Sequence, residues 1–72
     1  MSSIVDARGL SCPQPVLLTV SEIKKIQKGE IVILVDTDTS KENVSRAAIS
    51  NGWTLKGVET EGSGYRVSIS RE

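Results

Sequence analysis

The sequence predicts a two-layer α/β (α+β) sandwich, in which one four-stranded mixed sheet carries two helices on one face. Three observations predict this fold. Four short segments show the β-branched runs or the alternation typical of strands. Two longer segments repeat apolar residues at the helical period. The segments follow one another as β-α-β-α-β-β, and 72 residues are expected to form a single domain, residues 1–72.

The first strand is expected at residues 3–7 and the first helix at residues 13–27. A helical crossover of this kind makes the first two strands parallel. Leu18 lies off the apolar face of the helix and is expected to stay exposed, whereas Gly29 suits the left-handed position that ends a helix. The predicted inner face contains Val16, Val20 and Ile23 and, less centrally, Leu17 and Ile26.

The second strand is expected at residues 30–36, which contain an unbroken apolar run from Ile31 to Val35. Such a run is typical of a central strand. Val32 and Leu34 are expected to face away from the helices, so that the open face of the sheet is partly apolar.

The second helix is expected to begin at a capping box, with Thr39 as the cap and Glu42 three residues later. It should run to about Asn51, and Gly52 should close it. Its predicted inner face contains Val44, Ala47 and Ala48.

A hairpin completes the predicted sheet, with strands at residues 53–61 and 65–70 joined by residues 62–64. Val58 is out of phase with the apolar residues before it, so Gly57 is expected to mark a β-bulge that restores the phase. The last strand should turn three side chains to one face: Tyr65, Val67 and Ile69.

Composition and charge exclude several classes of function. Nine basic and nine acidic residues give no net charge, and Trp53 and Tyr65 are the only aromatic residues, so we expect no direct nucleic-acid binding. The first residues lack the pattern of a signal peptide or membrane span, so we expect no membrane association. A lone cysteine favours a reducing compartment, and the cytoplasm is therefore the expected location. The sequence leaves the oligomeric state open.

Cys12 is the only cysteine, and two prolines fix its place at the start of the predicted helix. If Cys12 is the cap, Pro13 and Pro15 are the first and third helical residues, and neither needs its N–H for a helical bond. Gln14 then supplies the nearby helical N–H. The helix dipole favours a thiolate there, and Arg8 would add a positive charge if the loop folds back. We therefore predict a lowered pKa and an accessible sulfur at Cys12.

The rest of the chain limits what this thiol can do. There is no histidine and no second cysteine, which excludes a Cys-x-x-Cys redox centre and a Cys-His dyad and makes a redox sensor unfavourable. A single thiolate can still attack a sulfane sulfur on another protein and carry it as a persulfide, without metal or cofactor. The competing interpretation is a non-catalytic interaction or regulatory module in which Cys12 is a small buried hydrophobe.

Two further patterns are weaker indications of function. Asp36 and Asp38 are too few to indicate a metal site, and a solvated loop is the better interpretation, so no metal is expected. Lys24, Lys25 and Lys28 would suit an acidic partner or simply form a solvated helix face.

Residues 6–15, with the sequence Asp-Ala-Arg-Gly-Leu-Ser-Cys-Pro-Gln-Pro, closely resemble the signature of the TusA/SirA/YedF-like sulfur-carrier family. The resemblance extends to Gly29-Glu30 and to Gly52, and so covers nearly the whole chain. It implies a fold like the C-terminal domain of bacterial translation initiation factor three.

The resemblance also implies a function. Cys12 would accept sulfur from a cysteine desulfurase or a rhodanese-type donor and pass it to a thiol-containing acceptor protein. Family members serve tRNA thiolation, molybdenum-cofactor synthesis and sulfur oxidation. The resemblance implies that the neighbours of Cys12 support it, as a motif of Asp6, Arg8, Gly9, Pro13, Gln14 and Pro15.

Two segments depart from the relay members of that family. Residues 41–46 look more like YedF-type proteins linked to selenium metabolism, which makes a selenium-associated role the alternative. Trp53 stands where relay members often have histidine.

Overall fold

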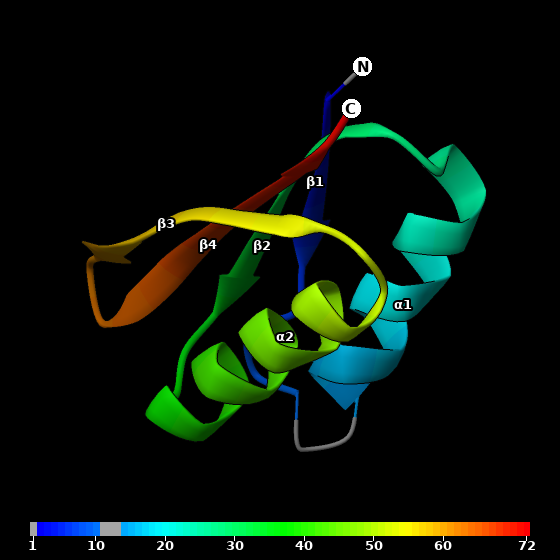
Figure 1. Cartoon of the computed structure of the whole chain (residues 1–72). Coiled ribbons are helices and arrows are strands. Elements are labelled where there is room, and N and C mark those ends of the chain that lie inside the picture. The colour runs from blue at the N-terminus through cyan, green and yellow to red at the C-terminus, as the bar shows by residue number, and fades with distance from the viewer. Residues whose placement is uncertain (1, 11–13) are drawn as a thin grey trace.

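The computed structural model describes residues 2–10 and 14–72 and has the predicted β-α-β-α-β-β order (Figure 1). Its elements are β1 (Ser2–Asp6), α1 (Gln14–Ile26), β2 (Gly29–Val35), α2 (Asp38–Ser50), β3 (Thr54–Glu61) and β4 (Gly64–Arg71). Over these described ranges neither helix is long and apolar enough to cross a membrane.

The four strands form one mixed sheet in the order β1-β2-β4-β3. β1 and β2 are parallel, while β4 is antiparallel to both of its neighbours, β2 and β3. α1 and α2 pack against each other and against one face of the sheet (Figure 1). The predicted fold class is therefore confirmed.

β2 is an inner strand, and its side chains alternate between the two faces of the sheet. Ile31, Ile33 and Val35 are fully buried beneath the helices, whereas Val32 and Leu34 are only half-buried on the other face. Ile4 pairs with Val32 across the parallel ladder and is 69% exposed. The partly apolar open face is thus confirmed.

The core lies between the helices and the covered face of the sheet. Trp53 belongs to it, just before β3. The buried apolar residues are Ala7, Ile23, Ile31, Ile33, Val35, Val44, Ala48, Trp53, Val67 and Ile69.

The predicted inner face of α1 is confirmed at Ile23, which is buried in the core, and at Val16 and Ile26, which pack against it. The buried residues of α1 are Pro15, Thr19 and Ile23, and Leu17 is 55% exposed, so placing Leu17 at the margin of the inner face was wrong. Thr19 can be buried because its hydroxyl donates to the carbonyl of Pro15 at 2.9 Å. Leu18 is exposed, as predicted.

The predicted end of α1 was also displaced. Gln27, with φ at +59°, takes the left-handed position, and its N–H donates to the carbonyl of Ile23 at 2.9 Å. Gly29 instead opens β2, where it pairs with Arg71. The left-handed position therefore lies two residues before the glycine that the sequence favoured, and the helix itself ends at Ile26.

α2 begins one residue after Thr37, which replaces Thr39 as the cap. The side chain of Thr37 accepts the N–H of Ser40 at 3.1 Å, and its backbone is extended. This earlier start gains helical residues and places Asp38 in the first turn, where the helix dipole favours a carboxylate. At the other end Asn51 is the cap and Gly52 has φ at +83°, which confirms the predicted stop.

The hairpin has a two-residue turn, Gly62-Ser63, between paired Glu61 and Gly64. The register shifts between Leu55 and Gly57, which confirms the predicted bulge.

Candidate functional site

The candidate site is the loop between β1 and α1, which contains the single cysteine. Ser11, Cys12 and Pro13 lie outside the described residues. The cap role, the exposure and the lowered pKa of Cys12 therefore remain predictions. The structure does describe the residues on each side of this segment.

On the β1 side, Asp6 and Arg8 form an exposed ion pair with two parallel hydrogen bonds. Arg8 Nε donates to Asp6 Oδ1 and Nη2 donates to Oδ2, each at 2.9 Å, and the Arg8 backbone N–H also reaches Oδ1 at 3.2 Å. These bonds lower the pKa of Asp6 to about 2 and raise the pKa of Arg8. The charge of Arg8 is thus paired with the carboxylate of Asp6.

The next residues are tied to the end of β2. The Ala7 N–H donates to the Leu34 carbonyl at 2.8 Å, and the Gly9 N–H donates to Asp36 Oδ2 at 2.8 Å. Gly9 has φ at +77°, a conformation that glycine adopts without strain. Sequence reasoning missed Asp36 as a site residue, because its contact is with a residue 27 positions away.

On the α1 side, the helix begins in the described residues at Gln14, whose side chain is exposed. Pro15 is fully buried in the first turn, a position where a proline is tolerated. The segment of Cys12 therefore runs between a loop held by β2 and a helix start held by the core.

Three exposed leucines flank this segment on its two sides. They are Leu10, Leu17 and Leu18. Only Leu18 was predicted to be exposed.

A second cluster joins the start of α2 to β4. The Tyr65 hydroxyl donates to Asp38 Oδ1, and Lys41 Nζ lies 3.6 Å from the same oxygen and 4.6 Å from the centre of the Tyr65 ring. The hydroxyl bond lowers the pKa of Asp38 and raises the pKa of Tyr65. Asp36 and Asp38 thus bond to different parts of the protein.

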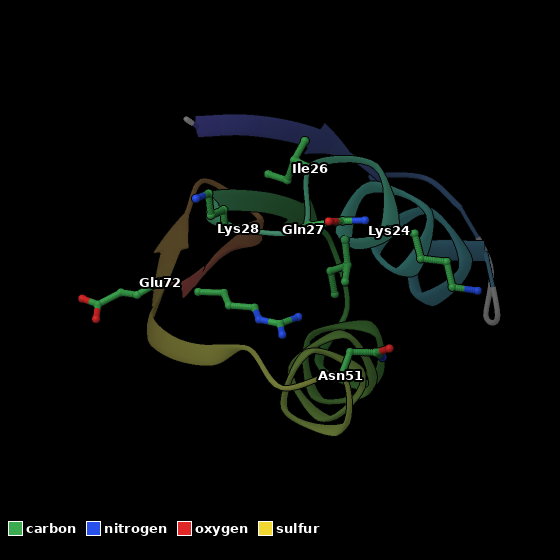
Figure 2. A pocket seen from close by; sticks show the side chains of 8 residues that line it. Lys24, Ile26, Gln27, Lys28, Asn51 and Glu72 are labelled. Atoms are coloured by element: carbon green, nitrogen blue, oxygen red, sulfur yellow. The ribbon is translucent and has the colours of Figure 1, made fainter.

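The largest of the cavities considered, about 640 Å³, lies at the other end of α1 (Figure 2). Its lining combines two lysines at the end of α1 with the end of α2 and of β4: Ile23, Lys24, Ile26, Gln27, Lys28, Asn51, Arg71 and Glu72. Both helices end here, and their terminal carbonyls attract cations. Lys24 and Lys25 lie in the last turn of α1, where the helix dipole favours a cation.

Comparison with known proteins places the chain in a family. The family model described as "Sulfurtransferase TusA" matches residues 3–71. A protein of Methanocaldococcus jannaschii whose name describes a sulfur carrier is 32% identical over 68 residues, which cover 93% of this chain and 91% of the relative. The sulfur carrier protein TusA of Pseudomonas entomophila is 27% identical, over 94% of this chain and 86% of its own.

One relative is much longer. YrkF of Bacillus subtilis, also named as a sulfur carrier, is 35% identical over 60 residues, which cover 82% of this chain and only 32% of YrkF. Among solved structures, the SirA-like protein of Desulfitobacterium hafniense superposes with a TM-score of 0.86 at 27% identity, covering 94% of this chain and 95% of the other. Fold, family model and relatives agree with one another, and this chain belongs to the TusA family of sulfur carrier proteins.

Proposed function

We propose that this protein is a sulfur-relay component that accepts sulfane sulfur as a persulfide on Cys12 and transfers it to an acceptor protein. The observation that carries the proposal is the match of the TusA family model to residues 3–71, in a chain with a single cysteine. The names of the relatives, which describe sulfur carriers, support it further.

The chemistry requires one nucleophilic sulfur. The Cys12 thiolate attacks the terminal sulfur of a donor persulfide, a new S–S bond forms on Cys12, and the donor S–S bond breaks. The donor leaves as a thiolate, and Cys12 becomes a persulfide without net oxidation or reduction. In the second step an acceptor thiolate attacks the outer sulfur of that persulfide, and Cys12 is released as a thiolate.

The proposed donor is a cysteine desulfurase or a rhodanese-type protein, and the proposed acceptor is a protein with a reactive thiol. Leu10, Leu17 and Leu18 support docking near Cys12, because exposed apolar side chains favour protein contacts. A reducing compartment such as the cytoplasm would keep the lone thiol available.

Intact mass spectrometry under anaerobic conditions tests the proposal. The protein is incubated with a cysteine desulfurase and cysteine, or with a rhodanese and thiosulfate, beside a Cys12→Ser variant. We expect one added sulfur on the wild type alone, released by reductant. Serine is a good helix cap, so the variant should remain folded.

The competing interpretation, a non-catalytic interaction or regulatory module, predicts a different result. A wild type that gains no sulfur from either donor, and whose thiol also resists iodoacetamide, would contradict the carrier function and favour a structural Cys12. A thiol that reacts with iodoacetamide but takes no sulfur would contradict both proposed donors. Loading from a selenium source alone would favour the selenium-associated role.

A further inference from the structure

We propose that Asp36 is a positioning residue for Cys12, acting through the backbone of Gly9. The inference rests on the proposed function and extends it to a residue outside the motif of residues 6–15. It is drawn from the hydrogen bond between the Gly9 N–H and Asp36 Oδ2, at 2.8 Å.

Asp36 stands at a well-held point of the fold. It directly follows β2, whose last residue, Val35, is fully buried, and it directly precedes the α2 cap, Thr37. Asp36 therefore lies on a short connection between an inner strand and a capped helix. Sites carried by such elements are held more closely than sites carried by loops alone.

The bond that Asp36 accepts is of the strong, charge-assisted kind. It adds to the Ala7–Leu34 bond, so residues 7–9 are fastened to the end of β2 at two points. Of these two, only the Asp36 bond depends on a side chain, and it is the one nearer in sequence to Cys12.

Gly9 precedes Cys12 by three residues, and Pro15, buried in the core, follows it by three. The cysteine therefore lies on a short stretch of chain between two anchors. Loss of the Asp36 bond releases one anchor and leaves the other intact. A misplacement of about 1 Å can lower the rate of a reaction on the order of a hundredfold, so a single anchor can matter for sulfur transfer between proteins.

Charge and hydrogen bonding act in different ways here, and two variants separate them. Removing the Asp36 carboxylate changes the charge of the loop as well as its hydrogen bonding. Asp36→Asn removes the charge but retains a carbonyl oxygen that can accept the Gly9 N–H. Asp36→Ala removes the charge and the acceptor together. The difference between the two variants therefore measures the hydrogen bond.

The experiment measures two rates for wild type, Asp36→Asn and Asp36→Ala: persulfide loading from the desulfurase, and alkylation of Cys12 by iodoacetamide as a function of pH. Glu42→Ala is the control, since it removes an exposed carboxylate of α2. Trp53 fluorescence checks that each variant is folded. We expect Asp36→Ala to load about tenfold more slowly than wild type, and Asp36→Asn and Glu42→Ala to stay within about threefold.

The alkylation profile of Asp36→Ala should differ from that of Asp36→Asn in midpoint or limiting rate. Equal profiles and equal loading for these two variants would overturn the inference, because only charge would then matter. Wild-type rates in Asp36→Ala would overturn it as well. If the wild type accepts no sulfur, the proposed function fails, and the alkylation profiles alone then decide whether Asp36 positions the thiol.

Discussion

Around the loop of Cys12, the charged side chains are engaged by specific neighbours in the protein. Arg8 donates to Asp6 through its Nε and Nη2 atoms, and Asp36 accepts from the Gly9 backbone. The prediction that Arg8 adds a positive charge near Cys12 if the loop folds back stays a prediction, and the described residues pair that charge with Asp6.

The Asp6 carboxyl should titrate with a midpoint of about 2 in the folded protein, against its ordinary 3.8, because the bonds from Arg8 favour its charged form. The folded pKa is depressed, so the stabilisation is complete above the ordinary value and is lost as the pH falls through about 2. Carbon-13 NMR of the side-chain carboxyl measures the midpoint. In Arg8→Gln it should return toward the ordinary value, and an unchanged midpoint would contradict the assigned cause.

The sequence identified part of this site and missed the rest for a physical reason. Asp6, Arg8 and Gly9 are neighbours in the chain, and the family motif predicts a supporting role for them, which stays a prediction. Asp36 and Tyr65 each bond to a partner 27 residues away. Those contacts depend on the register of the sheet and on the start of α2, which the periodicity of apolar residues does not specify.

At the scale of helices and strands, termini were harder to predict than the elements themselves. Thr37 and Thr39 both have the chemistry of a cap, and the Glu42 spacing favoured the later one. Tertiary contacts explain the earlier start, because Asp38 in the first turn accepts the Tyr65 hydroxyl from β4. In α1 one residue of the inner face was misjudged: Leu17 is exposed, whereas Thr19 is buried because its hydroxyl bonds within the helix.

Replacing the cap tests this assignment. Thr37→Ala should lower the free energy of unfolding by about 1 kcal/mol, because the Ser40 N–H loses its acceptor. Thr39→Ala is the matched control and should leave stability unchanged or slightly raised, since alanine favours a helix interior. Urea unfolding followed by Trp53 fluorescence measures both variants. A larger loss in Thr39→Ala than in Thr37→Ala would restore the cap that the sequence favoured.

Over the whole molecule, the two faces of the sheet differ in their surroundings. The helices cover one face, while the other exposes Ile4 and leaves Val32 and Leu34 half-buried. The alternation within β2 predicted this asymmetry, since a strand places successive side chains on opposite faces. The same type of mutation should therefore lower the free energy of unfolding by very different amounts on the two faces.

The same change on each face measures this difference. Ile33→Val should lower the free energy of unfolding by about 1 kcal/mol, because a methylene leaves a filled core. Ile4→Val, on the open face, should change stability by less than about 0.5 kcal/mol. Equilibrium urea unfolding gives both values, and equal losses would mean that another chain or segment covers the open face in solution.

The position of β4 has a consequence for synthesis on the ribosome. β4 follows every other strand in the chain, yet it lies between β2 and β3, which have no ladder with each other. A nascent chain that has emerged only as far as β3 can pair β1 with β2, but β3 has no neighbouring strand until residues 64–71 appear. During that interval β2 and β3 each expose a row of unpaired backbone groups, and such edges are where chains associate wrongly. The short Gly62-Ser63 turn keeps the delay small, because β4 can pair with β3 as soon as it leaves the exit tunnel.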